Sequence, residues 1–159
     1  KTGDIDGAWV PEPWATRLVT EGGGKVLVDE RDEWPNKQFV TTVLLVSKSY
    51  LAAHPDTVKA LVAANAKAID TIDADPAKAA PIVAAGITKA AGKAIKDSLV
   101  ADSFKSITFT VDPIASSLYG VADHAAALGG KKASLDGIFD LSILNSLLAS
   151  EGKPAVASK

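Results

Sequence analysis

The chain has 159 residues, of which 47% are hydrophobic and 23% charged, and its formal net charge is −2. This apolar content excludes intrinsic disorder, and 12 glycines with 8 prolines exclude a collagen-like or linker sequence. With 17 basic against 19 acidic residues, the chain has no electrostatic basis for binding nucleic acid or an acidic membrane surface. The length fits one ordinary domain or part of a two-lobed one.

The chain has no cysteine, which excludes disulfides, thiolate metal sites, iron–sulfur clusters and a cysteine nucleophile. Its only histidines, His54 and His124, lie far apart in the sequence, and no HExxH pattern is present. We therefore expect no metal site and no cofactor.

In chain order, the first predicted element is a short strand over 5–10 (IDGAWV), which ends at Pro11 because proline cannot donate to a sheet. A helix is expected from Pro13, with Trp14 and neighbouring apolar residues on one side. The glycines at 22–24 should end it, since glycine suits the left-handed position after a helix.

Two more strands are predicted before the chain becomes helical. Residues 25–28 (KVLV) form the first, and a charged connection over 29–37 follows. Residues 38–46 (QFVTTVLLV) are nearly all apolar or threonine, as in a strand covered on both faces. This is the longest β-type segment of the chain.

Helical patterns dominate the rest. Ser47 should cap a short helix, and Asp140 should cap the last one. The helices are expected over 48–53, 56–73, from 76 with a kink or early end at Pro81, from 88 to about 101, 113–128 and 140 to about 148. A brief extended piece is expected at 107–111, a loop at 131–139 and a loose tail at 152–159.

Strands therefore concentrate in the first 46 residues, whereas a self-contained α/β domain alternates strands and helices throughout. The apolar stripe of helix 56–73 needs a sheet that one strand cannot supply. We expect the chain to be the C-terminal part of a larger fold.

Lys1 is not an initiator methionine, which predicts a processed or trimmed chain, and no signal peptide is recognisable in it. Its apolar runs are far shorter than a membrane span, so a soluble protein is expected.

Catalytic motifs are missing or incomplete. The segment 21–25 (EGGGK) is not a P-loop, because Val19 and Val26 stand where a glycine and a Ser/Thr are needed. No GxSxG elbow is present, so a Ser–His–Asp triad has no support. A structural role is the better interpretation of His54 and His124, and solvated loop charge of the acidic residues at 29–33. We expect no enzymatic activity.

All three tryptophans, Trp9, Trp14 and Trp34, lie in the first 34 residues. The segment Trp9-Val-Pro-Glu-Pro-Trp14 places one indole at a strand end and one at a helix start. In α/β folds such positions bind ligands, because unpaired N–H groups and the helix dipole attract anionic groups, and indoles would cover the apolar part of a small ligand. The alternative is that these tryptophans are core residues.

The segments GDIDGAWVPEPWATRLVTEGGGKVLVDE and QFVTTVLLVSKSYLAAHPDTVKALV resemble the C-terminal portion of substrate-binding proteins of ABC importers for nitrate, sulfonate and taurine. Gly7 departs from the family pattern by one inserted residue. The resemblance is strong over residues 3–65 and looser to about residue 150. The matching residues are Gly3, Ile5, Asp6, Trp9, Glu12, Pro13, Trp14, Gly22, Gly23, Lys25, Val26, Leu27, His54, Pro55, Asp56, Val58, Lys59 and Ala60.

The resemblance implies an α/β fold of the type II periplasmic-binding-protein class, with two lobes that close on a ligand. It assigns residues 1–37 to the end of the second lobe, 38–46 to a hinge or return strand, 47–150 to the helical C-terminal part of the first lobe and 151–159 to a tail. The remaining strands would lie in a missing N-terminal portion, which would also carry the secretory or lipoprotein signal.

The function implied is an extracytoplasmic solute-binding component that captures a small organic anion, such as a sulfonate, taurine or nitrate, and delivers it to a membrane permease. The expected ligand-binding residues are Trp9, Glu12, Trp14, Gln38, Thr41 and Thr42. Glu12 would repel an anion, so either it points away, towards a helix-terminal N–H, or the ligand also carries a cationic group. Thr41 and Thr42 are adjacent, so in a strand only one would face the cleft. The alternatives are an enzyme on the same fold, as in thiamine-pyrimidine synthases, and the effector-binding domain of a transcription regulator.

Overall fold

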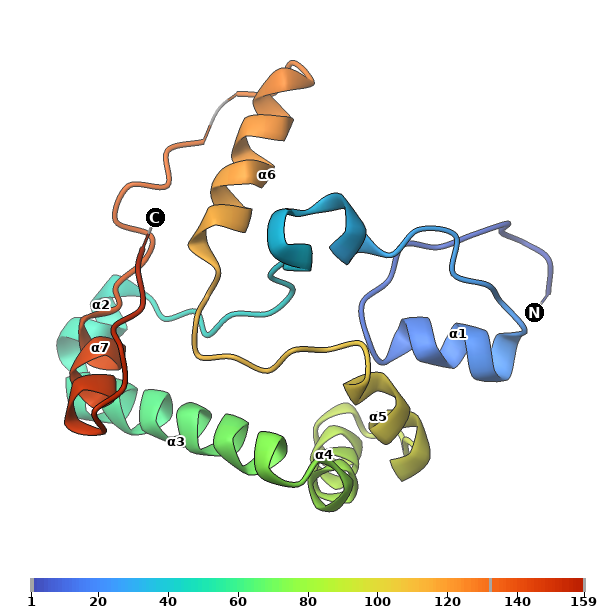
Figure 1. The fold of residues 1–159 in the computed structure, drawn as a ribbon, viewed down its shortest axis with the longest axis horizontal. Helices are drawn as coiled ribbons and strands as arrows, with labels where there is room; N and C mark the ends of the chain where they lie inside the picture. Colours follow the sequence, from blue (N-terminus) through green and yellow to red (C-terminus); the bar gives the residue numbers. More distant parts are fainter. Residues whose placement is uncertain (1, 132, 159) are drawn as a thin grey trace. The chain divides into compact units, whose positions relative to one another are not determined.

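The computed structural model describes residues 2–131 and 133–158, and within these ranges the regular structure is entirely helical (Figure 1). The α-helices, in chain order, are α1 (Trp14–Gly22), α2 (Lys48–Ala53), α3 (Pro55–Ala74), α4 (Pro76–Ala91), α5 (Asp97–Phe104), α6 (Ala115–Ala127) and α7 (Ser142–Ser150). Two short 3₁₀ helices, η1 (Glu30–Glu33) and η2 (Pro35–Lys37), lie in the charged connection between α1 and α2.

The strand predictions are wrong for this structure. Residues 5–10, 25–28 and 38–46 have no regular secondary structure, and no strand is assigned anywhere in the described ranges. A strand exists only through hydrogen bonds to a neighbouring strand, whatever the β preference of its residues. These segments have the amino-acid composition of strands, but the described ranges contain no neighbouring strand with which they could pair.

The helix starts and ends follow local rules closely. The Ser47 side chain accepts a hydrogen bond from the backbone N–H of Tyr50 at 3.1 Å, which confirms it as the cap of α2. The prediction that Asp140 caps the last helix is wrong, because Leu141 precedes α7 and makes no side-chain capping bond, while Asp140 Oδ1 accepts a bond from the backbone N–H of Ser142 at 3.1 Å. Gly23 ends α1 with φ of 74°, in the left-handed conformation expected there.

The prediction of one helix from residue 88 to 101 is wrong. Gly92, with φ of 67°, ends α4 in a left-handed turn, and α5 begins at Asp97. A backbone in that conformation cannot continue a right-handed helix. Pro81 does not end α4, which runs on through it to Ala91.

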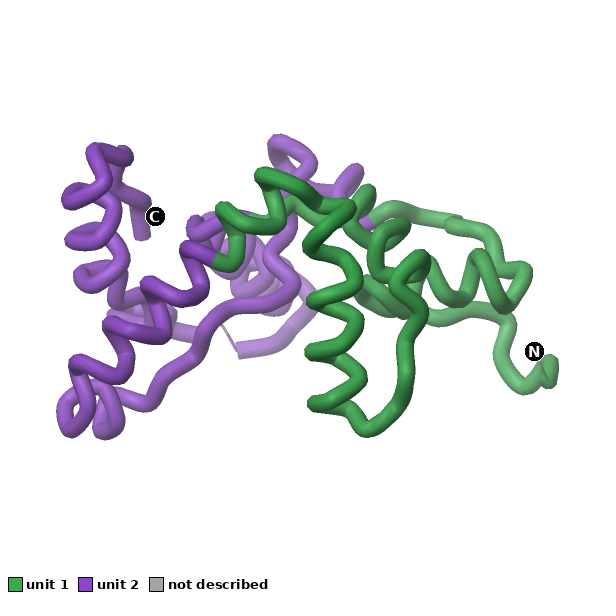
Figure 2. Tube along the Cα trace, turned by 90° about the horizontal axis from the view of Figure 1, so that it is seen from below, with its two compact units in different colours: residues 1–29, 68–109 green, residues 30–67, 110–159 purple. Residues whose placement is uncertain are grey.

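The chain divides into two compact units, residues 1–29 with 68–109 and residues 30–67 with 110–159 (Figure 2). In the first unit, α4 and α5 pack side by side around a small core of Ala80, Ala84 and Val100. Alanine at these positions lets two helices approach closely. Partly buried residues complete this core: Val83, Ile87, Ile95, Ala101 and Phe104.

The second unit contains α2, α6, α7 and both 3₁₀ helices. Leu144 and Leu148 of α7 are buried, and the backbone N–H of Val40 donates to Ser117 Oγ of α6 at 3.4 Å. The predicted loose tail is fastened at one point. Asn145 accepts a bond from the N–H of Val156 at 2.8 Å and donates to its carbonyl at 3.1 Å.

Among the described residues, no helix combines the length and the apolar character needed to cross a membrane.

Candidate functional site

The first group of predicted ligand residues surrounds the start of α1, in the first unit. Trp9 is 79% exposed and Trp14 is 51% exposed, so neither indole is a core residue in this structure. Pro11 and Pro13 fix the reversal between them, and Pro13 is the residue immediately before α1. Two large apolar rings next to a helix start are available to cover a ligand.

The expectation of unpaired amides at this helix start is wrong. The N–H groups of Trp14 and Ala15 donate to the Pro11 carbonyl at 3.0 and 3.2 Å, and that of Arg17 donates to the Pro13 carbonyl at 3.0 Å. The remaining amide, that of Thr16, donates to Glu12 Oε2 at 3.1 Å. The first turn of α1 therefore offers an anion no unpaired N–H group.

Glu12 takes the place that an anionic ligand would occupy at this helix terminus. Its carboxylate satisfies a first-turn amide and complements the positive end of the helix dipole. Of the two alternatives for Glu12, this geometry corresponds to a side chain directed at a helix-terminal N–H.

Arg17 is the charged residue beside Trp14 that the sequence reasoning missed. Its guanidinium carbon lies 5.8 Å from the centre of the Trp14 ring, within cation–π range. Its Nε donates to Glu21 Oε2 at 2.9 Å. The signal was present, because residues three apart on a helix share a face and Trp14 and Arg17 have that spacing.

Glu21 links α1 to the start of α5. Lys96 Nζ donates to Glu21 Oε1 at 3.1 Å, while Arg17 holds the other carboxylate oxygen. The hydrogen bond from Lys96, followed by that from Arg17, lowers the pKa of Glu21 below its ordinary value. Glu21 thus stays ionised and fixes the side chain that lies next to Trp14.

The second group of predicted residues, Gln38, Thr41 and Thr42, lies in the second unit. All three are exposed and belong to the segment 38–46, which is neither a strand nor a helix. The backbone N–H of Gln38 donates to the Pro35 carbonyl at 3.3 Å, which ends η2. The six predicted residues thus fall into two groups, one in each unit.

Trp34 has a structural environment quite unlike that of the other two tryptophans. Its indole N–H donates to Glu30 Oε1, and its ring centre lies 4.7 Å from that of Phe39 and 5.4 Å from that of His124. Gly120 of α6 lies against the same ring. This set of residues, the Trp34 cluster, gives His124 the structural role that was expected.

Glu30 contradicts the interpretation of residues 29–33 as solvated loop charges. Its side chain is partly buried against Trp34, and Oε2 is buried without a hydrogen bond from the described residues. The residue therefore belongs to the Trp34 cluster rather than to the solvated surface.

No set of three or more His, Asp or Glu side chains within the described ranges is placed to hold a metal ion. The α1 site offers exposed indole rings, one guanidinium and hydrogen-bonding carboxylates, groups that can bind a ligand.

Comparison with known proteins supports such a binding role. The family model of the NMT1-like family matches residues 1–88, which include every predicted ligand residue. The chain belongs to the NMT1-like family. This family is made up mostly of substrate-binding proteins and has the periplasmic-binding-protein fold, which confirms the resemblance at the level of the family.

One relative is the bicarbonate transport ATP-binding protein CmpC of Synechocystis sp. (strain ATCC 27184 / PCC 6803 / Kazusa), which is 41% identical over 64 residues. The match covers 40% of this chain and 9% of that protein, so the chain spans only a small part of its relative. No solved structure matches the chain.

Proposed function

We propose that this chain is part of the solute-binding component of an ABC importer, which captures a small organic anion by closure of two lobes. The observation that carries the proposal is the NMT1-like match over residues 1–88, a range in which Trp9 and Trp14 stand exposed. In such proteins the contacts made in the closed state supply affinity, and no bond is made or broken.

Trp14 and Arg17 are the residues that we assign to the ligand on α1. The exposed indole would cover the carbon chain of the ligand, and the guanidinium beside it would meet the anionic end. Arg17 takes over the role first expected of the helix amides, because those amides already have acceptors. Trp9 would extend the apolar surface, and Glu12 would hold the helix start in shape.

The lobes follow the family fold. We propose residues 1–37 as the end of the second lobe, 38–46 as the hinge or return segment and 47–150 as the helical part of the first lobe, with 151–159 as the tail.

Gln38, Thr41 and Thr42 would then offer hydrogen bonds from the hinge. An N-terminal portion of the same protein would pair with the strand-like segments and complete both sheets.

The ligand class that we propose is a small anion: a sulfonate, taurine, nitrate or a similar compound. Bicarbonate belongs among the compounds to test, because the relative CmpC is named for bicarbonate transport. The protein would work outside the cytoplasmic membrane and hand its ligand to a membrane permease.

Calorimetric titration of the protein, as its own gene produces it, with taurine, an alkanesulfonate, nitrate and bicarbonate tests this function. Trp14→Ala should weaken binding of the preferred anion about ten- to a hundredfold, since it removes roughly 1–3 kcal/mol of apolar burial. The control is Tyr50→Ala, which removes an exposed ring from α2 and should leave affinity unchanged.

Unchanged affinity in Trp14→Ala, together with a large loss of stability in the ligand-free form, would assign Trp14 to packing and remove it from the site. Failure of all four anions to bind the wild-type protein would overturn the proposed ligand class.

A further inference from the structure

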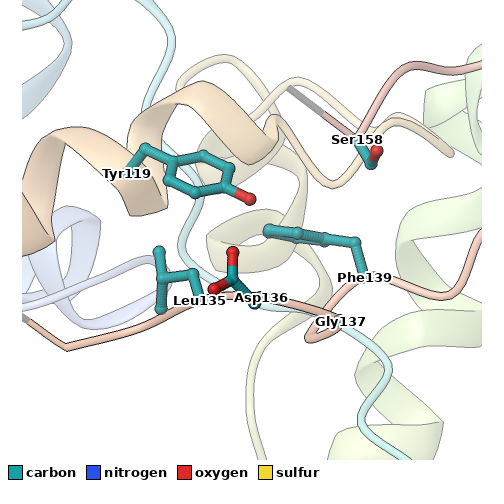
Figure 3. A pocket seen from close by; sticks show the side chains of 6 residues that line it. All are labelled: Tyr119, Leu135, Asp136, Gly137, Phe139 and Ser158. Carbon is teal, nitrogen blue, oxygen red and sulfur yellow. The ribbon is translucent and has the colours of Figure 1, made fainter.

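A small cavity lies in the second unit, outside the part of the chain that the family model matches. Its volume is about 140 Å³, and it lies between α6, the turn after residue 134 and the end of the chain (Figure 3). Cavities of about 150 Å³ hold a benzene-sized molecule, so this one admits a ligand of a few heavy atoms. The residues that line it are Tyr119, Leu135, Asp136, Gly137, Phe139 and Ser158.

Two aromatic rings form opposite parts of the cavity wall. The ring centres of Tyr119 and Phe139 are 6.2 Å apart, and the ring planes are inclined by 39°. A positive charge placed at the opening between them would lie within about 6 Å of both centres, the range in which ring faces attract cations.

The carboxylate of Asp136 supplies the matching charge. Figure 3 shows one of its oxygens directed towards the region of the two rings and the other towards Leu135. Ser134 Oγ donates to Asp136 Oδ2 at 2.9 Å and accepts a bond from the Asp136 N–H at 3.3 Å. These two bonds fix the position of the carboxylate. Asp136 is exposed, and it forms no ion pair with any residue of the described ranges.

A local turn presents this carboxylate. The N–H of Ile138 donates to the Leu135 carbonyl at 3.2 Å, and Gly137 has φ of +67°, a conformation that suits glycine. Lys48 Nζ lies 4.0 Å from the position that a Cβ would take on Gly137. A cationic side chain thus already approaches the rim of the cavity without pairing with Asp136.

We propose that this cavity binds a small organic ammonium ion, with its charge beside the Asp136 carboxylate and its carbon substituents against the Tyr119 and Phe139 rings. Primary and quaternary ammonium compounds share this chemistry. The hydroxyl groups of Tyr119 and Ser158 would accept hydrogen bonds from a primary ammonium, which a quaternary one cannot donate. The inference is independent of the proposed anion site on α1.

The test is a titration of the protein with tetramethylammonium chloride and with methylammonium chloride, followed through the amide NMR signals of Asp136, Gly137 and Phe139. Both salts should shift these signals, and the two affinities tell which kind of ammonium the cavity prefers. tert-Butanol, a neutral molecule of nearly the same shape as tetramethylammonium, should not shift them at equal concentration.

Three variants and one control separate the contributions. Asp136→Asn should weaken tetramethylammonium binding several-fold, about three- to tenfold, through loss of the charge. Phe139→Leu should weaken it about two- to thirtyfold through loss of a ring face. Lys48→Gln should tighten it, because a competing positive charge leaves the rim. Asp73→Asn, which removes the same charge from an exposed position on α3 in the other unit, should leave it unchanged.

The proposal is overturned if tert-butanol shifts the signals as strongly as tetramethylammonium, or if neither ammonium salt shifts them. It is also overturned if nitrate binds here and Lys48→Gln weakens that binding, since the cavity would then be an anion site. Lys48→Gln and Phe139→Leu keep the test decisive even if Asp136→Asn does not fold. Trp14→Ala should not affect tetramethylammonium binding, so failure here and failure of the anion site are distinguishable.

Discussion

Gly120 shows how one residue without a side chain permits the packing of a large one. A Cβ added to Gly120 would lie 2.8 Å from Cζ3 of Trp34, a distance that real Cβ contacts do not reach. The ring cannot move away easily, because Glu30, Phe39 and His124 hold it. Glycine in the middle of α6, which costs helix stability by itself, is thus required by the neighbouring ring.

We predict that Gly120→Ala lowers the free energy of unfolding by about 1–3 kcal/mol, the usual cost of overpacking. Gly86 in α4 is the matched control, because a Cβ there meets nothing within 4 Å. Gly86→Ala should instead stabilise the protein by roughly 0.5–1 kcal/mol through helix propensity. Urea unfolding followed by tryptophan fluorescence and circular dichroism measures both. Equal effects of the two substitutions would contradict the tight contact at Gly120.

At the scale of elements, polar links to neighbouring helices position α1 and the tail. Lys96, the residue before α5, pairs with Glu21 near the end of α1, and Asn145 of α7 binds Val156. Neither link follows from local sequence rules, since its partners lie 75 and 11 residues apart. Each link joins two parts of the chain that come together only in the folded structure.

The lowered pKa of Glu21 predicts a pH dependence of the link between α1 and α5. A carboxylate whose pKa is lower in the folded state stabilises that state above its unfolded pKa, about 4.5, and this stabilisation is lost as the pH falls through the folded value. Glu21→Gln should therefore lower the thermal midpoint at about pH 6 and match the wild type at about pH 3.

Glu33→Gln, at an exposed glutamate of η1, is the control and should change the thermal midpoint little. High salt should reduce the effect at Glu21, because Lys96 is exposed and Glu21 is only partly buried. A difference between Glu21→Gln and wild type that does not vary with pH would show that the ion pair with Lys96 does not form in solution.

At the scale of the whole molecule, apolar side chains stand exposed on the segments that were expected to be strands. Leu27 is 96% exposed and Leu45 is 82% exposed, and their neighbours Val26 and Leu44 are exposed as well. Extended apolar segments with unpaired backbone groups invite further strands to pair with them. Such surfaces suit the further strands that we propose for an N-terminal portion of the same protein.

We predict that the 16.3 kDa chain by itself elutes in gel filtration as an associated species, or together with another polypeptide, and binds a hydrophobic dye. The double variant Leu27→Lys and Leu45→Lys should reduce both association and dye binding. Val121→Lys with Leu128→Lys, which changes two exposed apolar residues outside these segments, is the control. A compact monomer that binds no dye would contradict the idea of missing strands.

Several features of the molecule were determined by sequence alone because they depend on neighbours along the chain. Ser47 caps α2 and Gly23 ends α1, as predicted. The helices α3 and α4 begin at Pro55 and Pro76, where the two prolines predicted helix starts. The order and spacing of motifs over the first part of the chain also indicated the family, which the NMT1-like match confirms. Capping bonds and proline geometry act within a few residues, so no tertiary contact is needed to find them.

Only the tertiary structure decided that the strand-like segments of the described ranges form no strands, that the amides of the first turn of α1 are hydrogen-bonded and that Glu30 is partly buried. Residues 38–46 lack the partner that a strand requires, and the α1 amides were taken by Glu12 and by the Pro11 and Pro13 carbonyls. The Glu30 carboxylate accepts a hydrogen bond from the indole N–H of Trp34 in a partly buried position. Each of these outcomes depends on where a second group lies in space, which its position in the sequence does not tell. Pairing and burial are set by distances in space rather than by spacing along the chain.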